Sequence, residues 1–265
     1  MVLGILNYGI FAQGTRMNTI RISAVSYLNT LPFVYGILES GMLENVRLSL
    51  DVPSVCAAKL KSGEADIALV PSGAIPDFTS AQYVSDYCIG AVNRVRTVLL
   101  LSRVPLDAIR SVYLDFDSRT SVVLVKLLAR HFWNISPQWI ELHPGEAETV
   151  PGLETVVAIG DKTFSMAGDF PFVYDLAEEW IRFTSLPFVF AVWMTTRDLP
   201  ASLFASFNNA LAFGVSRKKE SLEFFRDRLP SCDDCLGYLE KNISYPFDGE
   251  KRKGLELFLE MIKRK

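Results

Sequence analysis

Short apolar runs rich in β-branched residues alternate with helical patterns along the first part of the chain. Such alternation is typical of an α/β fold, and we assign the chain to that class. Pro32 suits the first turn of a helix, Ser54 is a favourable helix cap, and Gly63 is a typical helix end. The predicted strands are 20–25, 46–52 and 66–70, and the predicted helices between them are 31–38 and 54–63.

The same alternation continues in the second half of the chain. Strands are predicted at 112–115, 138–142 and 156–159, helices at 120–132 and 175–184, and helical structure from 200 almost to the end. Each strand ends in a polar turn that leads toward a helix. Because ligands of open α/β sheets bind outside the carboxyl ends of the strands, these turns are the candidate sites.

Two long apolar strands, near 96–102 and 186–195, flank the middle segment. We interpret them as crossovers, one leaving a first lobe and the other returning to it. This is the layout of bilobed binding proteins that close about a hinge over a ligand in the cleft. The prediction divides the chain into a discontinuous first lobe, 18–99 plus 190–265, and an inserted second lobe, 100–189.

The bulk composition restricts the class of partner. Hydrophobic residues make up 49% of the chain and charged residues 22%, an ordinary globular balance, and the net charge is −3. Nucleic-acid binding usually needs a basic face, so the charge argues against it. No apolar run approaches the ~20 residues that cross a membrane.

The first 16 residues resemble a signal peptide only weakly. They lack a basic start, and Asn7 and Gly9 interrupt their apolar core. We expect residues 1–17 to be an extra segment from a start placed too early, with the folded protein beginning near Asn18. The expected location is the cytoplasm.

The familiar signatures of metal, nucleotide and triad chemistry are missing from the sequence. Cys232 and Cys235 form a C-x-x-C, but no second pair completes a zinc set, so free thiols are expected. His131 falls late in a predicted helix and His143 near a proline loop, so neither is a candidate site residue. We therefore expect no metal and no cofactor.

The turn Ser26-Tyr27-Leu28-Asn29 lies where the first strand ends and a helix begins. Backbone N–H groups at a helix start favour an anion, and Ser26 and Asn29 add further donors. The simpler interpretation is a helix cap with a packed tyrosine.

A second turn, Ser118-Arg119-Thr120-Ser121, has the same position before a helix. Three hydroxyls and a guanidinium at a helix start suit a carboxylate, which arginine can grip through two hydrogen bonds. The alternative is an N-capping cluster with Arg119 paired to Asp117. Ser72, Gly160 with Asp161, and Thr97 at the first crossover are weaker candidates.

Five segments together resemble one known family, the chorismate dehydratases of the futalosine route to menaquinone. They are I-R-I-S-A-V-S-Y-L-N-T-L-P (20–32), A-D-I-A-L-V-P-S (65–72), L-D-F-D-S-R-T-S (114–121), A-I-G-D (158–161) and D-L-A-E-E-W-I-R-F-T-S-L-P-F-V-F-A-V-W (175–193). The resemblance spans nearly the whole chain after residue 17. It implies the two-lobed fold of type II periplasmic binding proteins.

The resemblance also implies an activity, a hydro-lyase that converts chorismate to 3-[(1-carboxyvinyl)oxy]benzoate. Its active-site asparagine corresponds to Asn29, and Thr97 stands where the family has a serine. The turn 118–121 would hold one carboxylate, and Asn29 with Ser72 or Thr97 would contact the enolpyruvyl side or the leaving hydroxyl. With no well-placed histidine, the substrate's own enolpyruvyl carboxylate is the expected proton acceptor.

Two other functions fit the same sequence. One is a solute-binding protein for a small carboxylate, which shares the fold. The other is the neighbouring 1,4-dihydroxy-6-naphthoate synthase, for which we would expect a histidine in the cleft. The expected partner is a small molecule, and the sequence gives no oligomeric state.

Overall fold

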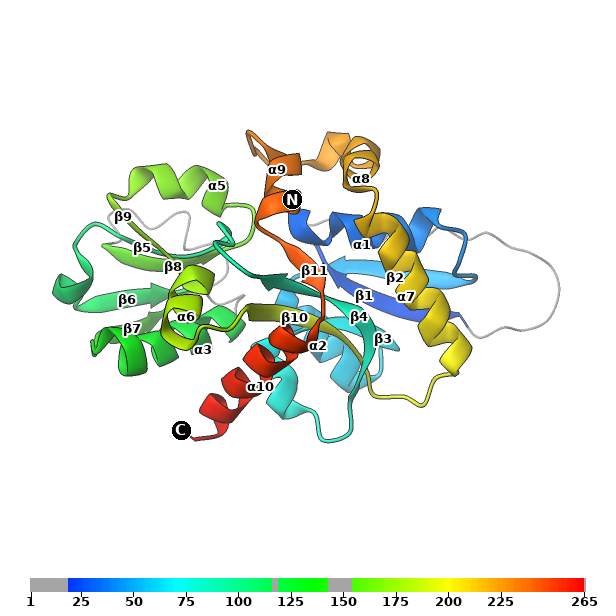
Figure 1. Cartoon of the computed structure of the whole chain (residues 1–265), viewed down its shortest axis with the longest axis horizontal. Helices are drawn as coiled ribbons and strands as arrows, with labels where there is room; N and C mark the ends of the chain where they lie inside the picture. Colours follow the sequence, from blue (N-terminus) through cyan, green and yellow to red (C-terminus); the bar gives the residue numbers. More distant parts are fainter. Residues whose placement is uncertain (1–18, 116–118, 143–153, 265) are drawn as a thin grey trace.

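The computed structural model describes residues 19–115, 119–142 and 154–264. The described strands form two separate sheets, one to each side of Figure 1, with helices packed on both. The α/β prediction is confirmed. The extra segment predicted at 1–17 lies outside the described residues.

The larger sheet has the strand order β11-β4-β10-β3-β1-β2. Strand β1 pairs in parallel with β2 and β3, whereas β10 runs antiparallel to β3 and β4. The strands are β1 (Ile20–Val25), β2 (Val46–Asp51), β3 (Ile67–Pro71), β4 (Gln82–Ala91), β10 (Phe188–Thr195) and β11 (Ser244–Pro246).

The smaller sheet has the order β7-β6-β8-β5-β9. Strand β6 is parallel to β7 and β8, and β5 is antiparallel to β8 and β9. The strands are β5 (Val98–Ser102), β6 (Ser111–Leu114), β7 (Gln138–Glu141), β8 (Thr155–Ile159) and β9 (Phe172–Asp175).

Helices cover both faces of the larger sheet. Strand β3 shows why: Ile67 and Leu69 join one apolar cluster, while Ala68 and Val70 join another on the opposite face, as the two-residue period of a strand requires. The helices are α1 (Leu31–Glu39), α2 (Pro53–Ser62), α3 (Arg119–Leu128), α5 (Thr163–Met166), α6 (Leu176–Thr184), α7 (Ala201–Val215), α8 (Lys218–Phe224), α9 (Cys235–Lys241) and α10 (Gly249–Lys263).

Helices α1 and α7 meet at their glycines. A Cβ atom built on Gly36 would lie 2.0 Å from the backbone oxygen of Ala210, and one on Gly214 would lie 1.8 Å from that of Pro32. Any larger side chain would force the two helices apart. This contact fixes α1, and with it the turn that connects β1 to α1.

The structure corrects several details of the sequence interpretation. Ser54 does not cap α2: the helix begins at Pro53 after Val52, and the cap makes no side-chain hydrogen bond. Gly63 ends that helix in the left-handed conformation, as predicted. Three strands were not predicted, β4, β9 and β11, and the last interrupts the helical structure expected after residue 200.

The chain changes sheet slightly earlier than the predicted lobe boundaries. All of β5 belongs to the smaller sheet and all of β10 to the larger one. The crossovers are therefore the segments 92–97 and 176–187, rather than the long strands themselves. The predicted division at 99/100 and 189/190 cuts through β5 and β10.

Candidate active site

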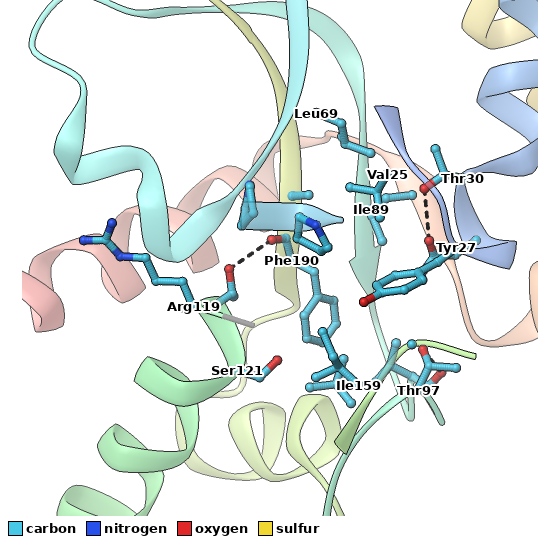
Figure 2. A pocket seen from close by; sticks show the side chains of 18 residues that line it. Val25, Tyr27, Thr30, Leu69, Ile89, Thr97, Arg119, Ser121, Ile159 and Phe190 are labelled. Carbon is cyan, nitrogen blue, oxygen red and sulfur yellow. Dashed lines mark hydrogen bonds between the residues drawn. The ribbon is translucent and has the colours of Figure 1, made fainter. Parts of the chain in front are cut away.

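A cavity lies between the two sheets and is lined by both of them and by the first crossover. It encloses about 560 Å³ of space, its open mouth included. Apolar side chains form most of its wall, among them Val25, Leu69, Ile89, Ile159 and Phe190 (Figure 2). Its polar lining consists of Tyr27, Asn29, Thr30, Thr97, Arg119, Thr120 and Ser121.

The turn after β1 places Asn29 on the cavity wall. A short 3₁₀ helix, Leu28–Thr30, begins there and leads into α1. The side-chain oxygen of Asn29 accepts a hydrogen bond from the Thr30 hydroxyl at 3.1 Å. Its backbone oxygen accepts from the Tyr245 hydroxyl at 2.9 Å, and its amide nitrogen donates to the Tyr238 hydroxyl at 3.4 Å. Asn29 is thus held at three atoms.

Thr97 faces the same cavity from the first crossover and is 1% exposed. Its hydroxyl lies 2.7 Å from the hydroxyl of Tyr238, the tyrosine that also contacts Asn29. Asp175 fixes the preceding backbone, because its carboxylate accepts from the N–H groups of Val95 and Arg96.

The smaller sheet touches the β1 turn through Gly160 and Asp161. A Cβ on Gly160 would lie 2.8 Å from the ring of Tyr27, and Gly160 has a φ of +70°. The carboxylate of Asp161 accepts from the Leu28 N–H at 3.1 Å from each oxygen. Burial raises the pKa of Asp161 to about 6, while the Leu28 hydrogen bond acts in the opposite direction. These contacts hold the two sheets together at one edge of the cavity.

The turn before α3 makes the corresponding contacts at the other edge. The Thr120 hydroxyl accepts from the Gly73 N–H at 3.0 Å and donates to the Phe190 carbonyl at 3.4 Å. The Arg119 guanidinium pairs with Asp77, its Nη2 lying 2.9 Å from Oδ1. Figure 2 shows the Arg119 side chain extending away from Phe190 and Tyr27. Arg119 therefore bridges the two sheets here.

The structure brings seven of the predicted site residues together and separates the others. The seven that line the cavity are Tyr27, Asn29, Thr97, Arg119, Thr120, Ser121 and Gly160. Ser26 and Asp161 line a smaller adjoining pocket, and Ser118 lies outside the described residues. Ser72 is fully buried, its hydroxyl donates to the Val189 carbonyl at 2.6 Å, and it is not among the described residues that line the cavity.

Other residues of the site were not found from the sequence. Thr30 lines the cavity and stands inside the S-Y-L-N-T-L-P segment, where its position could have revealed it. Tyr238 and Tyr245 follow Asn29 by 209 and 216 residues, and no local pattern connects them to it. Asp77, the partner of Arg119, gave no signal either.

The cavity lining is poor in ionisable groups. Of the described residues that line it, none is a histidine, lysine, cysteine, aspartate or glutamate. His131 is exposed elsewhere, and His143 lies outside the described residues. The site can thus orient a ligand through neutral donors and the start of α3, whose first N–H groups have no partner within the helix.

The described part of the chain gives two further negative findings. It contains no group of three histidine, cysteine or acidic side chains that could hold a metal ion, and no helix with the length and apolarity to cross a bilayer. The four cysteines are free thiols, as predicted for Cys232 and Cys235.

Solved structures share this architecture. Protein AF1704 from Archaeoglobus fulgidus superimposes with a TM-score of 0.70 at 15% identity, covering 92% of this chain and 97% of that one. A Candida albicans protein with the generic periplasmic binding protein fold has a TM-score of 0.64 at 14% identity, covering 91% and 90%. At these identities the similarity shows the fold, and the predicted two-lobed class is confirmed.

Sequence comparisons point to a family. The chain is 29% identical over 240 residues to the chorismate dehydratase of Thermus thermophilus, which is 83% of this chain and 88% of that protein. A family model described as menaquinone biosynthesis matches residues 20–264. The match covers both sheets and every residue of the cavity, and the chain belongs to this menaquinone biosynthesis family.

Proposed function

We propose that this protein is a chorismate dehydratase, a hydro-lyase that forms 3-[(1-carboxyvinyl)oxy]benzoate and water. The observation that carries the proposal is the similarity over most of the chain to the Thermus thermophilus chorismate dehydratase. The cavity supports it, because the candidate catalytic residue Asn29 lies on its wall, held at three atoms.

The reaction suits a site with few ionisable groups. The carbon that bears the enol ether loses its proton, the neighbouring carbon loses its hydroxyl, and the ring becomes aromatic. Aromaticity supplies a large driving force, so the protein mainly has to hold the dianion and stabilise the charge that develops. The proton acceptor in this proposal is the enolpyruvyl carboxylate of the substrate, because none of the described lining residues is a carboxylate or imidazole.

The cavity supports a division of roles between its two edges. Thr120 and Ser121, at the start of α3, would hold the ring carboxylate. Asn29 and Thr97 would contact the leaving hydroxyl and the enolpyruvyl group at the opposite edge. Charge-assisted hydrogen bonds from neutral donors contribute about 1.5–3 kcal/mol each, enough to fix the orientation of a small dianion.

The direct test is to incubate the purified protein with chorismate and follow the loss of diene absorbance together with the appearance of the aromatic ether. Enzyme-free chorismate serves as the control for spontaneous rearrangement. Catalysed formation of the ether is the expected result. Chorismate that binds but is recovered unchanged would refute the proposal and favour a solute-binding protein, the function suggested by fold neighbours such as the sulphonate-binding protein of Escherichia coli.

A cytoplasmic location belongs to the same proposal, since the reaction is a biosynthetic step. Cell fractionation with an antibody against the chain tests it. Recovery of the chain in the cytoplasmic fraction is the expected result, and recovery in the periplasm would contradict it.

A further inference from the structure

We propose that Tyr238 is a positioning residue for Asn29 and Thr97, fixing both as hydrogen-bond donors toward the ligand. The inference rests on the proposed function for the identity of the ligand. The carrying observation is that a single buried hydroxyl contacts both candidate catalytic side chains, which come from different parts of the chain.

Tyr238 lies behind the cavity wall and is not among the residues that line it. It is 0% exposed, on α9, and its ring packs edge-on against Phe164 with centroids 5.1 Å apart. The start of α9 is capped by Asp234, whose carboxylate accepts a hydrogen bond from the Gly237 N–H at 2.8 Å. The tyrosine therefore acts through the residues in front of it, and it is held in place from behind.

The direction of its hydrogen bonds follows from donor and acceptor chemistry. The amide nitrogen of Asn29 can only donate, so the Tyr238 oxygen is the acceptor of that bond. The hydroxyl hydrogen of Tyr238 is buried and needs an acceptor, and Thr97 Oγ1 lies 2.7 Å away. Tyr238 then donates to Thr97.

This direction determines what Thr97 offers to a ligand. With its oxygen accepting from Tyr238, the hydroxyl of Thr97 has its own hydrogen to donate. The protein acceptor recorded for that hydrogen, the Val95 carbonyl, is 3.5 Å away, at the limit for a hydrogen bond. A ligand oxygen in the cavity would be a better acceptor, and a leaving hydroxyl is such an oxygen.

Asn29 is oriented by the same network. Its side-chain oxygen is occupied by the Thr30 hydroxyl, and one amide hydrogen by Tyr238. The second amide hydrogen is left for the cavity. Two donors thus converge on the ligand from the β1 turn and the first crossover, which is what departure of a hydroxyl requires.

The protonation state of Tyr238 agrees with this role. Burial raises the pKa of Tyr238 far above its usual value, although the hydrogen bond with Thr97 acts in the opposite direction. The hydroxyl keeps its proton at neutral pH and remains a donor to Thr97.

An NMR experiment tests the positioning role without any turnover. In protein labelled with ¹⁵N-asparagine, the side-chain amide signals of Asn29 are assigned by their loss in Asn29→Ala. In Tyr238→Phe we expect these signals to shift and to exchange faster with water, with the other asparagine signals unchanged. Asn29 signals that keep their position and exchange rate would overturn the proposal.

Kinetics test the consequence for the reaction. We expect Tyr238→Phe to lower kcat for chorismate roughly 10- to 100-fold and to change KM less than threefold, the pattern of a lost transition-state interaction. In a Thr97→Val background the same change should lower kcat by a clearly smaller factor, because one of the two partners of Tyr238 is already missing and only the contact with Asn29 is left to lose. Equal effects in both backgrounds would show a merely structural role and overturn the proposal.

Matched controls separate this role from general damage. Tyr174→Phe removes the hydroxyl of a half-buried tyrosine on β9 that packs against Trp133, and it should leave kcat unchanged. If Tyr238→Phe does not fold, Thr97→Val removes the same contact from the other side and should shift the Asn29 amide signals. Thr97→Ser keeps the hydroxyl and should leave them in place. If wild-type protein does not dehydrate chorismate, the proposed function fails and the NMR result still decides the role of Tyr238.

Discussion

The two turns at the edges of the cavity both lead into a helix, and they differ in how they are held. Asn29, in the turn after β1, is fixed by the hydroxyls of Tyr238 and Tyr245 from its own side of the molecule. The turn before α3 is fixed by contacts across the cavity, Thr120 to Gly73 and Arg119 to Asp77. The Asn29 side chain is therefore held from its own side of the cavity, although the backbone of its turn also donates to Asp161 at Leu28, whereas Thr120 and Arg119 are held from the opposite side.

This difference indicates which edge performs chemistry. A group that stabilises a developing charge works best when its geometry is fixed in advance, which describes Asn29. A group that only retains the substrate can assemble as the cavity closes. The β1 turn is then the reacting edge, and the α3 turn is the binding edge.

The largest effect is expected at the reacting edge. Asn29→Ala should lower kcat for chorismate by roughly 10²–10³-fold, the usual cost of removing one preorganised donor, with little change in KM. Steady-state kinetics measure it, and Asn208→Ala, which removes an asparagine that hydrogen-bonds Ser85 and Asp86, is the control. A loss confined to KM would reverse the roles of the two edges.

The next effect is expected at Thr120. Thr120→Val removes a buried hydroxyl that accepts from the Gly73 N–H, and an unpaired buried donor costs about 1–3 kcal/mol. We expect KM to rise roughly tenfold, with kcat changed less than threefold. Thr120→Ser keeps the hydroxyl and should behave as wild type. If kcat falls instead, the binding edge also takes part in the chemistry.

For Arg119, the sequence and the structure predict losses of kcat/KM of different size. The sequence predicted a direct grip on a carboxylate, which would make Arg119→Ala lower kcat/KM by about 10–100-fold. The structure pairs the half-exposed guanidinium with Asp77, and exposed ion pairs contribute only about 0–1 kcal/mol. We therefore expect Arg119→Ala and Asp77→Ala each to lower kcat/KM by less than about fivefold. A large loss in Arg119→Ala alone would restore the direct grip.

The smallest effect is one on stability. The pKa of Asp161 is about 6 in the folded protein, above its ordinary 3.8, so the folded state holds the proton more tightly than the unfolded state. Its contribution to stability is present below about pH 4 and is lost as the pH rises through 6. Asp161→Asn does not titrate, so its unfolding free energy relative to wild type should rise between pH 4 and 7 by on the order of 1 kcal/mol. Urea unfolding across this range measures it, and a constant difference would contradict the raised pKa.

Local features predicted much of the fold. The strand at 20–25 and the helix that begins at Leu31 follow from apolar periodicity and from Pro32, which determine those segments without help from distant residues. Strand β11 could not be predicted in this way, because three residues among helices acquire strand structure only by pairing with β4. Ser54 was mistaken for a cap because Pro53, which needs no hydrogen bond at its nitrogen, can itself begin the helix.

The candidate site was predictable to the same extent. Asn29 and Thr97 were found because each stands beside a strand that leads to the cavity. The direction of the Arg119 side chain could not be predicted, because it depends on Asp77, which is 42 residues away in sequence and ends the 3₁₀ helix after β3. Tyr238 likewise enters the site only through the folded arrangement of α9.

The most direct test of the two-edge assignment is the crystal structure of Asn29→Ala with chorismate. The substrate should be bound intact, with its ring carboxylate at the start of α3 beside Thr120 and Ser121. Its leaving hydroxyl should lie within hydrogen-bond distance of Thr97, next to the space vacated by the Asn29 amide. A ring carboxylate bound instead at the β1 turn, or the aromatic product in the cavity, would contradict the assignment.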